Sequence, residues 1–207
     1  MVAIVFNIGM FSWLWIEAML KAGRKARARG IPVVLDPVGA GATRLRTMTA
    51  RRLLREAPPS IIRGNASEIR AALYSEDGAK GVDSTHAPEE ALEAALELSE
   101  RSGAVVCVSG ETDLIVLKGS VIRVANGHPM MPRVTGLGCT ATALAGAFAA
   151  VNPSPWRATA HAMAVLGIAG EMAAAQSPGP GTLQARLLDT LYAMNEGDIR
   201  DRLRMEG

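Results

Sequence analysis

Residues 134–151 read VTGLGCTATALAGAFAAV, and this stretch joins a glycine-rich turn to a long run of small apolar residues. Gly136 and Gly138 lead into Cys139, and the stretch contains no charged residue. The alanine-rich run predicts a helix that begins at about residue 139. The N-terminus of a helix leaves backbone N–H groups unpaired and carries partial positive charge, so the turn predicts a site for an anion such as a phosphate.

Cys139 lies at the mouth of this predicted anion site. Glycine at positions 136 and 138 would let the backbone approach a phosphate without interference from a Cβ atom. A thiol at this place is suited to orient or deprotonate an attacking hydroxyl group. The same residues also fit a simple glycine-rich turn followed by a small buried cysteine, and the turn alone leaves both interpretations open.

The composition indicates a single α/β domain that spans residues 1–207, with 49% hydrophobic and 20% charged residues. The net charge is +2 and no block of basic residues occurs, so we expect no nucleic-acid partner and no membrane-surface partner. The two cysteines, Cys107 and Cys139, are too few for a disulfide framework and fit a reducing, cytoplasmic compartment. The apolar stretch 141–151 is too short to span a bilayer.

Apolar runs alternate with helical patterns along most of the chain. The pattern predicts buried strands at 1–7, 31–36, 60–65 and 104–110, and a β-hairpin at 113–127. It predicts further helices at 12–29, 49–57, 66–73, 88–102, 155–175 and 182–194. This order is typical of a mainly parallel sheet with helices on both faces.

Ligands of such sheets bind at the carboxyl ends of the strands. In this chain these ends fall at 7–9, 36–41, 63–65 and 109–113, and the turn at 134–139 joins them. Each of these positions is rich in Gly, Asp, Asn or Thr, which is the composition expected of a ligand-binding edge.

Eight blocks of sequence, in order, resemble the hydroxyethylthiazole kinase family of the ribokinase-like superfamily. The blocks are NIGM (7–10), GIPVVLDPVGAGAT (30–43), IIRGNASEI (61–69), KGVDS (80–84), VSGETD (108–113), NGHPMM (126–131), VTGLGC (134–139) and GPG (179–181). The resemblance implies a three-layer ribokinase-like fold and ATP- and Mg²⁺-dependent phosphorylation of the hydroxyl of 4-methyl-5-(2-hydroxyethyl)thiazole, a step of thiamine biosynthesis or salvage. It also implies a homotrimer with sites near the subunit interfaces.

The resemblance assigns a role to several residues. Most of the superfamily has Asp as catalytic base after the second glycine of the turn, and this family has Cys, which corresponds to Cys139. Arg63 and Ser109 would bind ATP, with a surface ion pair and a turn-stabilising hydroxyl as the alternatives. Gly136 would bind the hydroxyl end of the substrate. Small alcohols of another kind, such as a pyrimidine, are a second possible substrate class, although Cys139 in place of Asp argues against it.

The resemblance assigns Mg²⁺ to Asp36 and Glu68. Asp36 follows a predicted strand, and the alternative is an Asp-Pro turn. Glu68 stands three residues after Asn65, so the pair also fits a capping box at the start of a helix. Both roles are compatible, because a glutamate in the first helical turn faces the same edge of the sheet.

The chain departs from the family pattern at three places. Ser109 replaces the usual Thr, and Leu137 replaces the usual Thr or Ala and would narrow the rim of the anion site. Family members also carry a strand–helix–strand segment ahead of NIG that lines the thiazole pocket, whereas this chain begins inside the first predicted strand. We therefore expect the 207-residue chain to bind Mg-ATP but to bind the thiazole alcohol poorly. A non-catalytic remnant that binds nucleotide is the alternative.

Overall fold

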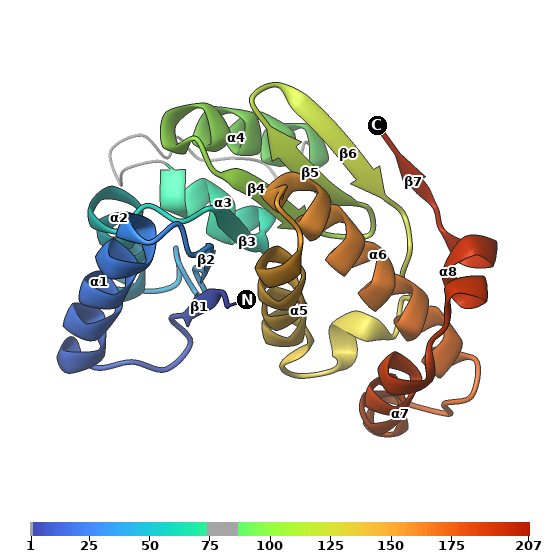
Figure 1. Ribbon diagram of the computed structural model, residues 1–207. Helices are drawn as coiled ribbons and strands as arrows, with labels where there is room; N and C mark the ends of the chain where they lie inside the picture. Colours follow the sequence, from blue (N-terminus) through green and yellow to red (C-terminus); the bar gives the residue numbers. More distant parts are fainter. Residues whose placement is uncertain (1, 74–86) are drawn as a thin grey trace.

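A computed structural model describes residues 2–73 and 87–207 of the chain; the block KGVDS (80–84) lies outside these residues. The described strands form one seven-stranded sheet in the order β1-β2-β3-β4-β5-β6-β7 (Figure 1). The strands are β1 (Ile4–Asn7), β2 (Val33–Asp36), β3 (Ile61–Asn65), β4 (Val105–Ser109), β5 (Asp113–Leu117), β6 (Ser120–Val124) and β7 (Met205–Glu206). Strands β1 to β4 are parallel, and β5, β6 and β7 extend the sheet antiparallel to their neighbours.

Helices cover both faces of the sheet, as the sequence predicts. One face carries α1 (Trp13–Ala28), α2 (Arg44–Glu56), α3 (Ala66–Leu73) and α4 (Ala87–Ser102). The other carries α5 (Leu137–Val151) and α6 (Pro155–Ala174), with α7 (Pro180–Ala193) packed on α6 (Figure 1). A short helix α8 (Glu196–Arg202) and a 3₁₀ turn at Met131–Arg133 complete the described elements.

The two faces follow from the alternation of side chains along each parallel strand. Val34, Ile61 and Cys107 point to the face that packs on α5 and α6. Leu35 packs with α1 and α2, and Ile62 packs with α3 and α4. Both faces of the parallel strands are therefore apolar, which explains why their sequences show continuous apolar runs.

The strand β1 departs from the prediction of a buried interior strand. It pairs only with β2 among the described strands, so it forms one edge of the sheet. Phe6 is buried, whereas Val5 on the other face is exposed. The apolar run at 1–7 has the composition of a buried strand but only part of its burial.

Helix boundaries shift where a cap lies outside the apolar pattern. The helix α2 begins at Arg44, five residues before the predicted start, because the hydroxyl of Thr43 accepts a hydrogen bond from the Arg46 N–H. The helix α5 begins at Leu137, so Cys139 lies inside its first turn. The sequence pattern did not predict α8 and β7, since α8 is short and charged and β7 has only two residues.

Within the described ranges, no helix combines the length and the apolar character that a bilayer crossing requires.

Candidate active site

The N-terminus of α5 is open. Gly136 is its N-cap residue and has a φ of +84°, in the left-handed region where glycine is favoured, and no side chain caps this end. In the described structure the backbone N–H groups of Gly138 and Cys139 have no hydrogen-bond partner, while the Thr140 N–H already bonds to the Gly136 carbonyl. Two free amides at a positive helix end form the anion site that the sequence predicts.

Gly136 and Gly138 are each explained by a different structural requirement. The predicted requirement, close approach of the backbone to a phosphate, is not needed to explain either glycine. Gly136 is required by its positive φ, and the space beside it is open. At Gly138, a Cβ atom would lie 2.8 Å from Nη1 of Arg63, which is too close for a side chain. The same guanidinium nitrogen donates to the Gly138 carbonyl at 3.1 Å. Gly138 therefore lets Arg63 lie directly under the turn.

Asn7 connects Cys139 to Asp36. Its Nδ2 atom donates to Sγ of Cys139 at 3.1 Å and to Oδ2 of Asp36 at 3.0 Å, so both N–H bonds of the amide are used. Its Oδ1 atom accepts from the Gly9 N–H, which holds the amide in this orientation. The thiol is exposed at this point, in contrast to the alternative of a buried cysteine at a helix start.

Asp36 is a buried carboxylate, 1% exposed, at the carboxyl end of β2. Its Oδ2 atom also accepts from the Thr142 hydroxyl at 2.8 Å. Burial raises the pKa of Asp36 to about 6, and the nearby charge of Glu68 adds to this rise. The Thr142 hydroxyl, the charge of Arg63 and the Asn7 amide lower it in part. Asp36 is followed by Pro37 and a turn, as in the Asp-Pro alternative, and its buried carboxylate also accepts hydrogen bonds from Asn7 and Thr142.

Glu68 forms the capping box. Its Oε2 atom accepts from the Asn65 N–H at 2.9 Å, and Oδ1 of Asn65 accepts from the Glu68 N–H at 2.9 Å. The other carboxylate oxygen accepts from the Gly39 N–H at 2.9 Å and so connects α3 to the loop after β2. The capping interpretation is thus correct, and the contact with Gly39 directs the carboxylate toward the loop of Asp36.

The donor set of Asp36 and Glu68 fits a magnesium ion. The two carboxylates repel each other, since the charge of Glu68 raises the pKa of Asp36, and a cation between them would relieve this repulsion. In the described part of the chain no group of three or more His, Cys, Asp and Glu side chains surrounds a common point. Mg²⁺ commonly binds one or two carboxylates and completes its shell with phosphate oxygens and water, which matches this sparse set. The metal role of the two residues stays a prediction.

Arg63 is buried, 9% exposed, and the surface ion pair considered for it is wrong. Its Nη2 atom donates to the Ser109 hydroxyl at 2.7 Å, and Ser109 in turn donates to the Gly64 carbonyl. The remaining donor, Nε, is buried without a partner in the described structure. Ser109 has the turn-stabilising contact that was its alternative role, and it also orients Arg63.

A cavity of about 900 Å³ opens beside this turn. Arg63, Ser109 and the residues 136–138 line one part of it, and Leu137 belongs to this wall while also packing on the apolar core. Another part of the lining comes from the loop after β6, from α6 and from the C-terminal segment. Its members there are Ala125, Asn126, Gly127, His128, Pro129, Met163, Leu166, Gly167 and Arg204.

The cavity also contains a buried carboxylate that the sequence analysis did not single out. Asp113 begins β5, is 7% exposed and accepts from the Gly110 N–H at 3.0 Å. Burial raises the pKa of Asp113 to about 6, and the Gly110 hydrogen bond and the charge of Arg63 only partly oppose this rise.

The structure therefore brings the predicted residues together in two groups. Cys139, Asp36 and Glu68 lie on the side of Asn7, whereas Arg63, Ser109 and Gly136 line the cavity. Asn7 lies at a strand end that the sequence predicts to belong to the ligand-binding edge, but its bonds to Cys139 and Asp36 and the role of Thr142 were not predicted. A polar residue inside an alanine-rich helix was the signal that Thr142 offered.

Comparisons with known proteins agree with this geometry. The sequence model described as the hydroxyethylthiazole kinase family matches residues 1–197. A hydroxyethylthiazole kinase of Syntrophus aciditrophicus is 56% identical over 204 residues, which cover 98% of this chain and 76% of the relative. The hydroxyethylthiazole kinase structure from Pyrococcus horikoshii is 37% identical with a TM-score of 0.89, and the match covers 99% of this chain and 76% of that one.

A pyridoxal kinase of Staphylococcus aureus in complex with ADP shares the fold at a TM-score of 0.61 and 21% identity, over 81% of this chain and 62% of the other. This likeness supports the expected ribokinase-like architecture and nothing narrower. With the match over nearly the whole chain and the open turn that carries Cys139, the chain belongs to the hydroxyethylthiazole kinase family.

Proposed function

We propose that this chain transfers the γ-phosphoryl group of ATP to the hydroxyl of 4-methyl-5-(2-hydroxyethyl)thiazole, in the thiamine pathway of the cytoplasm. The observation that carries the proposal is the Asn7 amide, which bonds to both Cys139 and Asp36 beside the uncapped N-terminus of α5. Membership of the family supports the thiazole alcohol over the pyrimidine alcohols.

The binding of ATP rests on the cavity side of the turn. The free amides of Gly138 and Cys139 would stabilise the transferring phosphoryl group, because they are fixed in position before the reaction. Arg63 lies under the same turn with an unused Nε donor and would neutralise phosphate charge. Ser109 orients Arg63, and Gly136 leaves open space for the hydroxyl end of the substrate.

In the chemical step, the alcohol oxygen bonds to the γ-phosphorus and the bond from this phosphorus to the bridging oxygen breaks. ADP leaves with the electron pair of the broken bond, and the hydroxyl proton passes to Sγ of Cys139 in its thiolate form, which becomes the neutral thiol. The demand on this base is modest, since phosphoryl transfer depends mainly on positioning and charge stabilisation. Asn7 holds the thiol toward the reacting hydroxyl and close to the metal-binding carboxylate.

Asp36 and Glu68 would hold Mg²⁺ together with the phosphates. When bound, the ion neutralises negative charge that develops on the phosphate oxygens. Glu68 would serve both as the cap of α3 and as a ligand, directly or through water.

The proposal is tested by incubating the 207-residue chain with Mg-ATP and the thiazole alcohol and measuring ADP release, with a hydroxymethyl pyrimidine as the competing acceptor. Turnover that prefers the thiazole supports the proposal. A preference for the pyrimidine, or nucleotide binding without any turnover, would overturn it in favour of another small-alcohol kinase or of a non-catalytic protein. Calorimetry with each ligand separately measures the affinities for Mg-ATP and for the thiazole alcohol.

We also propose that the chain assembles into a homotrimer. Its support is an exposed apolar surface at the start of α1, where Met10, Trp13, Leu14 and Trp15 are each exposed by more than 60%. Exposed clusters of large apolar side chains are typical of protein interfaces. Sedimentation equilibrium measures the mass of the assembly, and a monomer would contradict the proposal.

A further inference from the structure

The C-terminal segment reaches the cavity on the side away from Arg63. Strand β7 pairs antiparallel with β6, and the Ala125 N–H donates to the carbonyl of Arg204 just before β7 begins. Since β6 runs in the same direction as β4, its end at Val124 lies at the ligand-binding edge of the sheet. The topology therefore carries Arg204, which lies beyond the residues matched by the family, to the edge where Ser109 ends β4.

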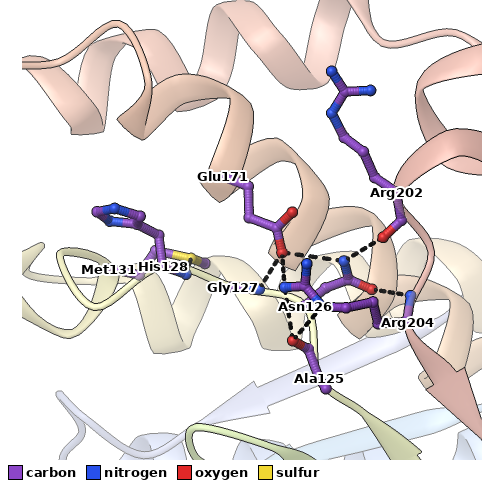
Figure 2. A network of polar contacts seen from close by, with 8 residues as sticks. All are labelled: Ala125, Asn126, Gly127, His128, Met131, Glu171, Arg202 and Arg204. Carbon is purple, nitrogen blue, oxygen red and sulfur yellow. Dashed lines mark hydrogen bonds and ion pairs between the residues drawn. The ribbon is translucent and has the colours of Figure 1, made fainter.

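A polar network holds this segment in place (Figure 2). Oε1 of Glu171, on α6, accepts from Nδ2 of Asn126, from the Gly127 N–H and from Nη2 of Arg204, at 3.1, 2.8 and 2.6 Å. Asn126 is 4% exposed, and its Nδ2 atom also donates to the Arg202 carbonyl, while its Oδ1 atom accepts from the Arg204 N–H. The network joins α6, the loop after β6 and the C-terminal segment.

The loop lies directly on α6 at this point. A Cβ atom at Gly167 would lie 2.6 Å from both the carbonyl oxygen and the Cβ atom of Asn126. The Gly127 N–H is taken by Glu171, and the Ala125 carbonyl is taken by Arg204. These backbone polar groups are therefore already paired. The side chains of Met163 and Leu166 line the cavity beside them, so its wall is mostly apolar here.

Arg204 is the charged exception in this wall. Its Nε and Nη2 atoms both donate to the Ala125 carbonyl, at 3.1 and 2.9 Å, which fixes one edge of the planar guanidinium. Its Nη1 atom has no partner in the described structure, and the side chain lines the cavity while it remains half exposed. A fixed guanidinium beside an apolar wall suits a flat aromatic group, on which it can stack.

The distance between the two cavity arginines limits what a shared ligand can be. Arg63 is on β3, and Arg204 directly precedes β7, four strand positions away. Their guanidinium groups lie closer together, because Arg63 bonds to Ser109 at the end of β4 and Arg204 bonds to the Ala125 carbonyl just after β6, two strand positions apart. At about 4.8 Å per neighbouring strand, the two groups lie roughly 10 Å apart across the sheet, so a single ligand that contacts both must span about this distance.

We propose that Arg204 binds the nucleoside end of ATP, and that Glu171 is the positioning residue that holds Arg204 and the loop of Asn126 in place. The inference rests on the proposed function, because it takes ATP to be the nucleotide whose phosphates lie at Arg63. It adds a contact carried by the C-terminal segment.

The test is calorimetric titration of the full 207-residue chain with Mg-ATP and, separately, with inorganic tripolyphosphate. Arg204→Ala is expected to weaken ATP binding about tenfold and to leave tripolyphosphate binding unchanged, since only ATP has a nucleoside. The matched control is Arg200→Ala, which removes an equal charge from the exposed face of α8, where Arg200 pairs with Glu196. It is expected to leave both affinities unchanged.

Two further variants separate binding from folding. Arg204→Gln keeps a donor for the Ala125 carbonyl and removes the planar cation, so it should weaken ATP binding as Arg204→Ala does while the melting temperature stays at the parental value. Glu171→Gln keeps the acceptor oxygen for Asn126 and Gly127 but loses the charge that holds Arg204. It should weaken ATP binding about threefold, without an effect on tripolyphosphate. Parental ATP affinity in Glu171→Gln would overturn the positioning role.

Parental ATP affinity in both Arg204 variants would overturn the inference, and so would an equal loss for ATP and tripolyphosphate. In either case, turnover of the thiazole alcohol by the parental chain would leave the proposed function intact. A parental chain that binds neither nucleotide nor tripolyphosphate would overturn both proposals together.

Discussion

The cluster around Cys139 and the cavity wall around Arg204 are built in different ways. In the cluster, the parallel pairing of β1 and β2 places Asn7 beside Asp36, and the start of α5 supplies Cys139. The wall draws on a loop, the middle of α6 and the last residues of the chain, which only the antiparallel half of the sheet brings together.

Because the two regions are built differently, we expect them to respond differently to mutation. In the cluster, polar atoms are shared among a few side chains that we propose to face the reacting atoms, so a single change should act on the rate of the chemical step. In the wall, the polar atoms are paired behind an apolar surface, so a change should act on the affinity for one end of a ligand.

The largest effect is expected at Cys139. Cys139→Ala removes the proton acceptor and should lower kcat about a hundredfold, while the KM for ATP stays near the parental value. Cys139→Asp should keep or raise activity, because a carboxylate is a better base at this position. Steady-state kinetics with both substrates measures this, and parental turnover in Cys139→Ala would show that the thiol only packs against its neighbours.

Asp113, which lines the cavity, tests the second of the two regions. Burial raises the pKa of Asp113 from 3.8 to about 6, so the folded state binds this proton more tightly than the unfolded state and loses stability as the pH rises from about 4 to about 6. Asp113→Asn stays neutral and keeps an acceptor for the Gly110 N–H. It should be more stable than the parental chain above pH 6, by roughly 2–3 kcal/mol.

Urea unfolding between pH 4 and pH 8 tests this difference, which should vanish near pH 4. The exposed Asp189 on α7 offers a control, since Asp189→Asn should not change the pH dependence. The same pH dependence in Asp113→Asn and in the parental chain would contradict the prediction.

Asn7 tests whether the cluster acts as a unit. Asn7→Ala removes the donors to Cys139 and Asp36 and should lower kcat about tenfold, with ATP affinity unchanged. Thr142→Val is the matched comparison, because it removes a hydrogen bond from Asp36 and leaves Cys139 untouched. We expect a smaller loss of kcat from Thr142→Val, and equal losses would mean that Asn7 acts through Asp36 alone.

The smallest effect is expected at Glu68. Glu68→Gln keeps one acceptor oxygen, so one of the two backbone N–H partners, Asn65 or Gly39, loses its bond at a cost of about 1 kcal/mol. The magnesium concentration for half-maximal turnover should rise severalfold. Asp198→Ala removes the side-chain acceptor of the capping box at Asn195 on α8 and should lower stability similarly without a change in magnesium dependence. An unchanged magnesium dependence in Glu68→Gln would leave Glu68 as a cap only.

The sequence pattern predicts the parallel half of the fold and the position of the glycine-rich turn. Apolar runs at β2 and β4, the shorter run Ile61-Ile62 in β3 and the helical patterns between them indicate parallel strands, since a strand buried on both faces needs apolar residues on both. The carboxyl ends of these strands share one edge, so the pattern alone predicts that Asp36, Arg63 and Ser109 lie near the turn of Cys139.

The sequence pattern could not show which atoms these residues contact. From the sequence, Arg63 is a cation at the end of a predicted strand. Its position under Gly138 depends on the lack of a Cβ atom at that glycine, which lies 75 positions further along the chain. From the sequence, Asn7 is one polar residue at the end of a strand. Its two partners, Asp36 and Cys139, are brought next to it only when β2 and α5 pack together.

The far wall of the cavity could not be predicted from the sequence, because it is built from segments that lie far apart along the chain. The strand β7 has only two residues, too few for a periodicity that would predict it. Its position follows from pairing with β6. Glu171 lies in the last turns of an apolar helix, where its charge is tolerated because three donors from Asn126, Gly127 and Arg204 converge on one oxygen. Local patterns are set by neighbours in the sequence, whereas such a network is stable only when distant segments are already folded together.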